Sequence, residues 1–302
     1  MPQADGGFHP GELVVQRQAG MAEQAARLAP MLDPPLLDGA MSRFVAERDF
    51  AILTSRDAER RIWTSPVFGD RGFCHAQGAT LTIAALPMPG DPLRCAAAGE
   101  SAGVLFLDLR RRRRLRVNGT VVAVGEHGFT VAVDQAFGNC PRHIQQRVLD
   151  RGGTGVEFEA VGCTDLRPEH VLLIERSDTF ILGTAHPTRG ADTSHRGGRP
   201  GFVRVDRGAL WWPDYPGNNM FNSLGNIVED PAAALLFLDF AAGEGLQLSG
   251  RARLDWIPPG TPGDDAGTDR RVHFAPERIV AMSGLPVRSL GPVATSMEPP
   301  LT

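Results

Sequence analysis

The stretch VLFLDL at residues 104–109 decides the fold of this chain, because it returns as LLFLDF at residues 235–240. A second pair of segments, RLRVNG at 114–119 and GLQLSG at 245–250, follows with the same separation and without a gap. Solenoid repeats are about 20 to 50 residues long. The unit repeated here takes up more than a third of the chain, so it indicates a duplicated domain rather than a solenoid.

The repeat extends upstream with a slightly shorter separation. RDFAILTS at 48–55 pairs with SDTFILGT at 177–184, and the change of two residues corresponds to one small loop difference. This internal duplication predicts three parts. They are an N-terminal extension (1–35), a first copy of the repeated domain (36–165) and a second copy (166–302).

Both copies have the sequence features of β-structure. Short apolar runs, such as residues 104–107 and 235–238, are separated by frequent Gly, Pro and Asp. Short strands at this spacing predict small barrels or sandwiches. The expected fold class is therefore mainly β, with a few short helices.

Three segments have the spacing of helices. Apolar residues within 37–45 predict a helix that leads into the first strand. Residues 220–228 predict a second helix, with Asn218 or Asn219 as its N-cap. Residues 144–149 predict a short helix between the two copies.

The composition excludes several functional classes. All 31 basic residues are Arg, and the chain contains no Lys. Pyridoxal-phosphate enzymes need a Lys for their Schiff base, and P-loop NTPases need one in their phosphate-binding loop, so both classes are excluded. The formal net charge of −4 provides no global basic field, so we expect no nucleic-acid partner.

Hydropathy predicts a protein without a membrane partner. No apolar run reaches the roughly 18 to 20 residues that a membrane span needs, and the N-terminus lacks the layout of a secretory signal. We therefore expect a cytoplasmic protein.

The cysteines indicate neither a metal site nor a disulfide. Cys74, Cys95, Cys140 and Cys163 form no CxxC pair and have no His at zinc-finger spacing. We therefore expect buried, reduced thiols and no bound metal.

A polar cluster in the second copy is the candidate site. DTSHRGGRPGF at 192–202 places hydroxyl, imidazole and guanidinium groups beside glycines, a composition that suits a phosphate. WWPDYPGNN at 211–219 then leads into the predicted helix, whose free N–H groups would add a second anion-binding element. The first copy matches these places only in part. We infer that one copy kept a ligand site and that the other became scaffold.

These motifs, followed by NSLGN at 222–226 and LLFLDF at 235–240, resemble the FMN-binding split-barrel superfamily of pyridoxamine 5′-phosphate oxidase. They are similar in particular to its tandem-barrel, flavin-nucleotide-binding branch. FHPGE at 8–12 and FGNCP at 137–141 also resemble that branch. The resemblance spans nearly the whole chain.

The resemblance implies a six-stranded antiparallel split barrel in each half, with FMN in a cleft between two barrels. It also implies that a strand-borne basic segment and the turn before the helix hold the flavin phosphate and the ribityl chain. These places fall on the following residues: Ser194, His195, Arg196, Asp214, Asn218 and Asn219.

One departure from the family changes the expected phosphate contacts. Pyridoxamine-phosphate oxidases proper have a Ser-Arg-Lys triplet in this turn, where the chain has GNN at 217–219. Phosphate charge would then rest on Arg196 and Arg199, or on arginines of the other half. The basic run Arg110 to Arg114, with Arg116, favours a solvated hairpin between two strands. The functional alternative is that Arg114 and Arg116, which share one strand face, reach across the barrel interface toward the flavin. The Arg and His arrangement that would clamp a pyridoxal substrate is also missing, so we do not expect vitamin B6 oxidation.

The sequence gives less evidence for two further candidate flavin contacts. Asn139 in FGNCP either caps a turn or contacts the flavin. Trp211 and Trp212 alternate on their strand, and we assign the flavin-facing position to Trp212. Three other histidines lie outside any motif and are interpreted as isolated residues: His127, His143 and His170.

The leading functional hypothesis is an FMN-dependent oxidoreductase that acts with a small-molecule substrate or electron donor. In such an enzyme the protein supplies binding, orientation and electrostatics, so no side chain is assigned a catalytic role. The alternatives are a non-catalytic flavin carrier, sensor or electron-transfer partner, and a split-barrel oxidoreductase that uses haem or a deazaflavin. A homodimer is also compatible with this family, because barrels can pair between chains.

Overall fold

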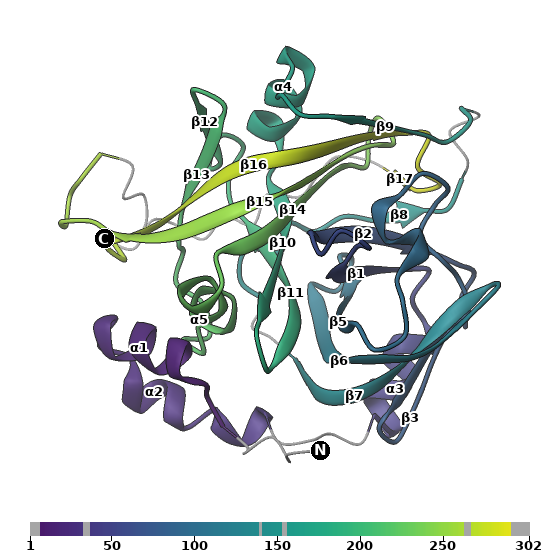
Figure 1. The fold of residues 1–302 in the computed structure, drawn as a ribbon, viewed down its shortest axis with the longest axis horizontal. Helices are drawn as coiled ribbons and strands as arrows, with labels where there is room; N and C mark the ends of the chain where they lie inside the picture. The colour runs from purple at the N-terminus through teal and green to yellow at the C-terminus, as the bar shows by residue number, and fades with distance from the viewer. Residues whose placement is uncertain (1–6, 33–36, 139–140, 153–155, 263–266, 291–302) are drawn as a thin grey trace.

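The chain forms two antiparallel β-sheets that lie side by side, with the N-terminal helices packed below the second sheet (Figure 1). The computed structural model describes residues 7–32, 37–138, 141–152, 156–262 and 267–290. Asn139 and Cys140 lie outside the described residues.

The first sheet has seven strands in the order β2-β1-β5-β6-β7-β4-β3. Consecutive partners in this order are antiparallel. Its strands are β1 (Phe50–Arg56), β2 (Ile62–Phe68), β3 (Cys74–Gln77), β4 (Thr80–Ile83), β5 (Ser101–Asp108), β6 (Arg113–Gly125) and β7 (Gly128–Gly138).

The second sheet repeats this order as β11-β10-β14-β15-β16-β13-β12. Its strands are β10 (Thr179–His186), β11 (Gly190–Gly197), β12 (Arg204–Asp206), β13 (Ala209–Pro213), β14 (Ala232–Asp239), β15 (Glu244–Trp256) and β16 (Arg270–Ser283). Strands β5 and β14 have equal lengths, as do β6 and β15, and both pairs are separated as the repeat predicts.

The predicted fold class is confirmed, with a larger strand count than the six per barrel that the resemblance implied. A short edge strand, β3 or β12, extends each sheet, and β9 (Glu159–Cys163) pairs with β16 as an eighth strand of the second sheet. Strand β9 precedes the predicted boundary at residue 166. A separate two-stranded ladder joins β8 (Leu149–Asp150) to β17 (Arg288–Ser289).

Each barrel begins with a helix. The predicted helix at 37–45 is confirmed as α3 (Gly39–Ala46), and α4 (Pro168–Arg176) takes the same place before β10. The sequence patterns did not reveal α4, although Pro168 at its first position is a common start signal.

The second predicted helix is confirmed as α5 (Asn222–Glu229), but its predicted N-cap is wrong. The residue before the helix is Phe221, which has a left-handed backbone with φ of 61°. The first copy has only a short 3₁₀ turn at this place, η2 (Pro92–Cys95). Helix α5 is therefore an element of the second copy alone, within the residues that the structure describes.

The helix predicted at 144–149 is wrong. This segment is not helical: it has no regular helix or strand up to residue 148, and Leu149 begins β8. Long-range contacts hold it in place. The Arg147 backbone N–H donates to the Leu109 carbonyl at 3.4 Å, and the Gln145 side chain donates to the Gly198 carbonyl at 3.4 Å. Tertiary partners thus replace the local hydrogen bonds that a helix would need.

The two barrels share a closely packed interface. A Cβ atom at Gly103 on β5 would lie 2.9 Å from the Asp192 backbone on β11, and one at Gly183 would lie 2.2 Å from the Thr64 hydroxyl. Thr193 donates to the Gly103 carbonyl at 2.8 Å across this interface. The interface therefore fixes the position of β11, which carries the candidate site.

Three N-terminal elements complete the described structure: α1 (Pro10–Gln18), α2 (Ala22–Ala26) and the 3₁₀ turn η1 (Ala29–Leu32). Helix α1 packs against α5, and η1 packs against β7 (Figure 1). None of the helices in the described residues is long and apolar enough to cross a membrane.

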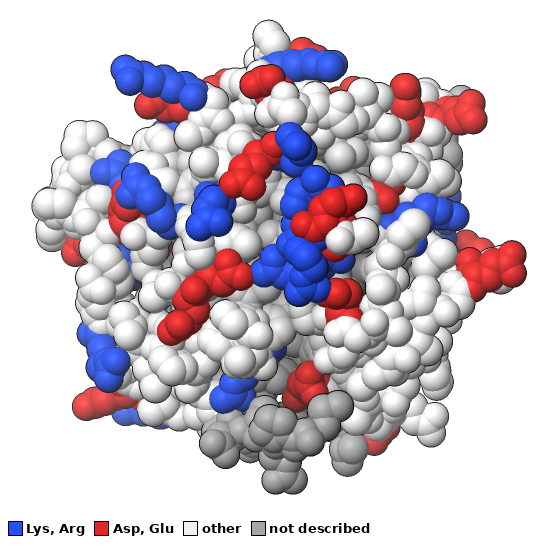
Figure 2. Space-filling model, in the orientation of Figure 1, with Lys and Arg blue, Asp and Glu red and all other residues white. Residues whose placement is uncertain are grey.

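The charged side chains are mixed in sign on the face that Figure 2 shows, where the basic groups at the centre alternate with acidic ones.

The cysteines differ from the expectation of buried thiols. Cys74 is buried and free, whereas Cys95 is exposed and Cys163 is partly exposed, both also free. In the described part of the chain, no three His, Cys, Asp or Glu side chains come together as a metal site.

Candidate functional site

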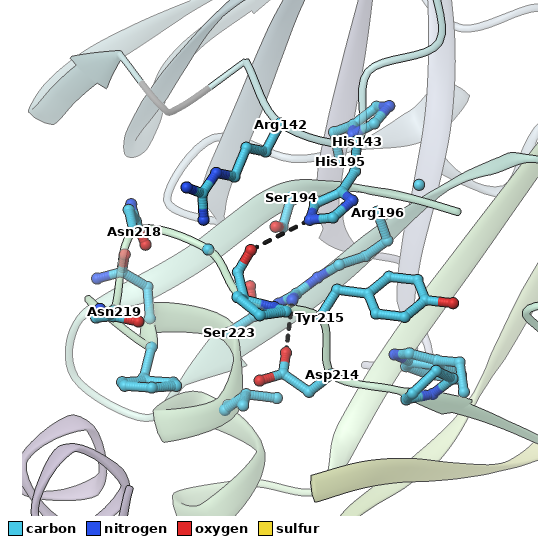
Figure 3. A pocket seen from close by; sticks show the side chains of 18 of the residues that line it. Arg142, His143, Ser194, His195, Arg196, Asp214, Tyr215, Asn218, Asn219 and Ser223 are labelled. Carbon is cyan, nitrogen blue, oxygen red and sulfur yellow. Dashed lines mark hydrogen bonds and ion pairs between the residues drawn. The ribbon is translucent and has the colours of Figure 1, made fainter. Parts of the chain in front are cut away.

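A cleft lies where the two barrels meet the start of α5 (Figure 3). Its empty space is about 740 Å³ when its open mouth is counted, and only about 80 Å³ of this admits the centre of a water molecule, so the cleft is narrow. It brings together nine of the residues predicted from the sequence: Arg114, Arg116, Ser194, His195, Arg196, Trp212, Asp214, Asn218 and Asn219.

Two predicted residues are not placed in this cleft. Arg199 is exposed beyond the end of β11 and does not line the cleft. Asn139 lies outside the described residues, so its predicted contact stays a prediction.

His195 on β11 is a buried, neutral imidazole. Burial and the neighbouring Arg114 guanidinium lower the pKa of His195 well below its ordinary value. Arg114 lies with its Nη1 atom 3.3 Å from His195 Nδ1, and a guanidinium can only donate, so the imidazole proton resides on Nε2. This Nε2 atom is buried and has no hydrogen-bond partner among the described residues.

Arg116 on β6 reaches from the first barrel into the second. Its Nη1 atom contacts both carboxylate oxygens of Asp192 at 3.1 Å, and its Nη2 atom donates to the Ser194 hydroxyl at 2.6 Å. Ser223 on α5 donates to the same carboxylate at 2.9 Å. The predicted reach of Arg114 and Arg116 across the interface is present, and both arginines line the cleft.

Asp214 bridges two arginines at the end of β13. It accepts from Arg196 Nη1 and from Arg270 Nε, each at 3.1 Å, and it is buried. Two guanidinium charges therefore face one carboxylate, and this part of the cleft carries a net positive charge. A carboxylate cannot donate to a phosphate when it is ionised, so Asp214 acts on an anion only by orienting Arg196.

The turn between Asp214 and α5 has an unusual backbone. Asn219 and Phe221 both have φ of 61°, and Asn218 accepts from the Met220 backbone N–H at 3.2 Å. This turn leaves the first residues of α5, Asn222 and Ser223, on the wall of the cleft. Backbone N–H groups at a helix start favour an anion.

Arg142 and His143 are two of the cleft residues that sequence reasoning missed. They come from the segment between the barrels, and His143 was interpreted as an isolated residue. Its Nε2 atom lies 3.2 Å from the Pro216 carbonyl, and its ring stacks on Tyr215 at 5.3 Å between centroids (Figure 3). The signal that could have found both residues is their position directly after the FGNCP motif.

Aromatic rings form one wall of the cleft. Trp212 is buried and meets Phe180 edge-on at 4.9 Å, while its indole Nε1 has no hydrogen-bond partner in the described part of the chain. Trp211 lies outside the cleft and packs between the guanidinium groups of Arg204 and Arg271, at 4.5 and 5.2 Å. The choice of Trp212 over Trp211 thus agrees with the position of the cleft.

The equivalent place in the first copy is filled. Gln247 on β15 is the residue of the second copy that corresponds to Arg116 in the first. It crosses the interface, and its side-chain amide donates to the Ser65 hydroxyl at 2.8 Å and to Asp91 at 2.9 Å in the first copy. Burial raises the pKa of Asp91 to about 6. These three side chains are buried and hydrogen-bonded to one another, although Gln247 Oε1 has no hydrogen-bond partner among the described residues.

Residues 166–256 match the family model described as pyridoxamine 5′-phosphate oxidase. This match confirms the resemblance that the sequence motifs predicted, over less than a third of the chain. A search of curated proteins found no match.

Solved structures similar to parts of the chain include three with low sequence identity. A structure described as a putative pyridoxamine 5′-phosphate oxidase from Lactobacillus delbrueckii is 15% identical, covers 38% of this chain and 93% of its own, and has a TM-score of 0.31. An FAD-binding protein from Mesorhizobium loti is 11% identical, with coverages of 41% and 99% and a TM-score of 0.29. The heme storage protein HutZ from Vibrio cholerae is 12% identical, with coverages of 40% and 96% and a TM-score of 0.30.

Proposed function

We propose that the chain binds FMN in this cleft and works as an FMN-dependent oxidoreductase. The observation that carries the proposal is a group of buried donors on cleft-lining side chains, which includes His195 Nε2, Arg196 Nε and Trp212 Nε1. All three atoms are buried, and none has a hydrogen-bond partner within the described residues. Leaving a buried donor unpaired costs about 1 to 3 kcal/mol, so a ligand that accepts hydrogen bonds would stabilise the site.

The charge of the cleft favours an anionic ligand. Arg196 and Arg270 share the single carboxylate of Asp214, and Arg114 and Arg142 add two further guanidinium groups to the lining. A phosphate dianion accepts charge-assisted hydrogen bonds from such groups. The hydroxyl of Ser194 and the amides of Asn218 and Asn219 suit the polyol chain that joins a flavin ring to its phosphate.

The aromatic side of the cleft suits the flavin ring. Phe202, Trp212 and Tyr215 line it, and the Phe202 and Tyr215 rings stack at 6.1 Å between centroids. The cleft is narrow, so we place the phosphate arm inside it and the ring toward its mouth. Bound FMN would supply hydride or electron transfer, while these residues bind it, orient it and limit the access of water.

The test begins with the absorption spectrum of the purified protein. A flavin spectrum, followed by removal of the cofactor and titration with FMN, should give saturable binding. A Soret band in its place would contradict the flavin proposal and indicate haem. Anaerobic reduction by NADH or NADPH then separates the two flavin hypotheses, because a flavin that stays oxidised would indicate a carrier rather than an oxidoreductase.

A further inference from the structure

The FHPGE motif at residues 8–12 lies outside the cleft, yet it forms the contact between the N-terminal segment and α5. His9 is the N-cap residue of α1, and the helix begins at Pro10. Helix α1 crosses α5 on the side away from the second sheet (Figure 1). The motif therefore lies where α1 crosses α5, close to the first turn of α5.

The two helices cross at a pair of glycines. A Cβ atom at Gly11 would lie 2.3 Å from the Gly225 carbonyl, and one at Gly225 would lie 2.6 Å from the Glu12 backbone nitrogen. Real Cβ atoms do not approach backbone this closely. The crossing therefore needs a glycine on both helices, and it brings the polar side chains of α1 onto α5.

Glu12 is buried at this crossing and is fully used in hydrogen bonds. One of its carboxylate oxygens accepts from the Asn222 side-chain amide, and the other accepts from the His9 backbone N–H at 2.7 Å. His9 in turn lies 3.0 Å from the Asn226 side chain, which donates to the Thr184 hydroxyl at 3.0 Å. A continuous polar network thus connects α1, α5 and β10.

Charged and titratable groups surround Glu12 on each element that packs near it. They are His9 on α1, Glu229 on α5, His186 on β10, Arg189 in the following turn and Asp192 on β11. Burial raises the pKa of Glu12 to about 7 and lowers the pKa of His9 to about 4. The carboxyl group of Glu12 therefore changes charge near neutral pH, while His9 stays neutral there.

The first turn of α5 is held from both sides. Asn222 contacts Glu12 on the α1 side, and Ser223 contacts Asp192 on the β11 side. Both Asn222 and Ser223 line the cleft. A change at Glu12 therefore acts on the cleft through Asn222, which contacts Glu12 and also lines the cleft.

We propose that Glu12 is a positioning residue for the cleft, which holds the first turn of α5 through Asn222 and so couples docking of α1 to occupancy of the cleft by an anionic ligand. The inference rests on the proposed flavin site for the identity of that ligand. Coupling is reciprocal, so the ligand and α1 must stabilise each other by the same factor.

Hydrogen exchange of the protein without added flavin tests the positioning step alone. Glu12→Ala should speed amide exchange in residues 220–229 and leave residues 101–125 of the first barrel unchanged. Glu12→Gln keeps one side-chain oxygen that can accept from the Asn222 amide, so it should restore most of the protection of α5. Glu23→Gln, at an exposed glutamate on α2, is the matched control and should change neither region.

Titration with FMN tests the coupling. Glu12→Ala should raise the Kd at least fivefold, and saturating FMN should slow exchange within α1 of the wild type. Wild-type affinity should weaken from pH 6 to pH 8 more than that of Glu12→Gln, because an ionised Glu12 places a negative charge behind the anion site. The Glu23→Gln control should follow the wild-type profile.

Two outcomes overturn the inference: faster exchange confined to residues 9–18 in Glu12→Ala, or an FMN affinity that is equal in Glu12→Ala and wild type. A wild type that binds no FMN refutes the proposed function instead. The exchange experiment then still decides whether Glu12 positions α5.

Discussion

Arg116 and Gln247 stand at equivalent positions of the two barrels, and of these two side chains Arg116 lines the cleft beside α5. Arg116 crosses the interface to Asp192 and Ser194, where the start of α5 leaves the space beside it open. Gln247 crosses the same interface in the opposite direction and is enclosed by Ser65 and Asp91. The two equivalent positions at the barrel interface therefore differ: the space beside Arg116 is open, whereas Gln247 is enclosed by other side chains. We refer to them as the open and the closed version of the site.

We predict one flavin per chain from this asymmetry. The open version has Arg114, Arg142 and Arg196 as cations, whereas the position equivalent to Arg114 in the closed version is Gly245. Calorimetric titration with FMN, combined with the mass of the protein in solution, should give a ratio of one. A ratio of two would show that the closed half also opens to a ligand.

Much of the fold could be predicted because the repeat is visible in the sequence. The aligned blocks at residues 104–109 and 235–240 fall mostly on β5 and β14, and their common separation predicted a duplicated domain, whose two copies share one strand order. Helix α5 could be predicted because its apolar face is periodic. Its N-cap could not, because the left-handed backbone at Phe221 depends on the fold of the whole turn.

The parts that could not be predicted depend on distant contacts. Residues 144–149 have helical spacing, but their backbone and side chains bond to Leu109 and Gly198. His143 lacks a counterpart in the repeat, and it reaches the cleft only because this connecting segment runs along the barrel interface. Arg199 was grouped with Arg196 by sequence proximity, although β11 ends between them at Gly197.

Replacing Arg196 should weaken FMN binding much more than replacing Arg199. Arg196→Ala removes a guanidinium from the cleft, and a hydrogen bond to a charged group contributes about 1.5 to 3 kcal/mol, so the Kd should rise at least tenfold. Arg199→Ala is the matched control, because its side chain is exposed outside the cleft. Fluorescence titration measures both values, and equal affinities for the two variants would contradict the assignment of Arg196.

The pH dependence of stability should change when Glu12 is replaced. Burial raises the pKa of Glu12 to about 7 from an ordinary 4.5, so the folded protein keeps this proton over a range where the unfolded chain has lost it. The wild type therefore loses stability from this group as the pH rises from 4.5 to 7, whereas glutamine does not titrate. The free energy of unfolding of Glu12→Gln relative to wild type should rise by about 1 to 3 kcal/mol over this range.

Urea denaturation at pH 5, 6, 7 and 8 measures this difference. Glu23→Gln should show no such trend, because Glu23 is exposed. A difference between Glu12→Gln and wild type that stays constant across these pH values would mean that Glu12 is not protonated in the folded protein near neutral pH.

The crossing of α1 and α5 should not tolerate a methyl group. Gly225→Ala would place its Cβ 2.6 Å from the Glu12 backbone nitrogen, so the helices must separate. Alanine favours a helix interior over glycine by about 1 kcal/mol, yet overpacking costs about 1 to 3 kcal/mol and the separation also breaks hydrogen bonds of Glu12. We therefore expect a net loss of stability of about 1 to 3 kcal/mol in urea denaturation. Gly217→Ala is the control, since nothing lies within 4 Å of its added Cβ. If Gly225→Ala were as stable as Gly217→Ala, α1 would not be closely packed on α5 in solution.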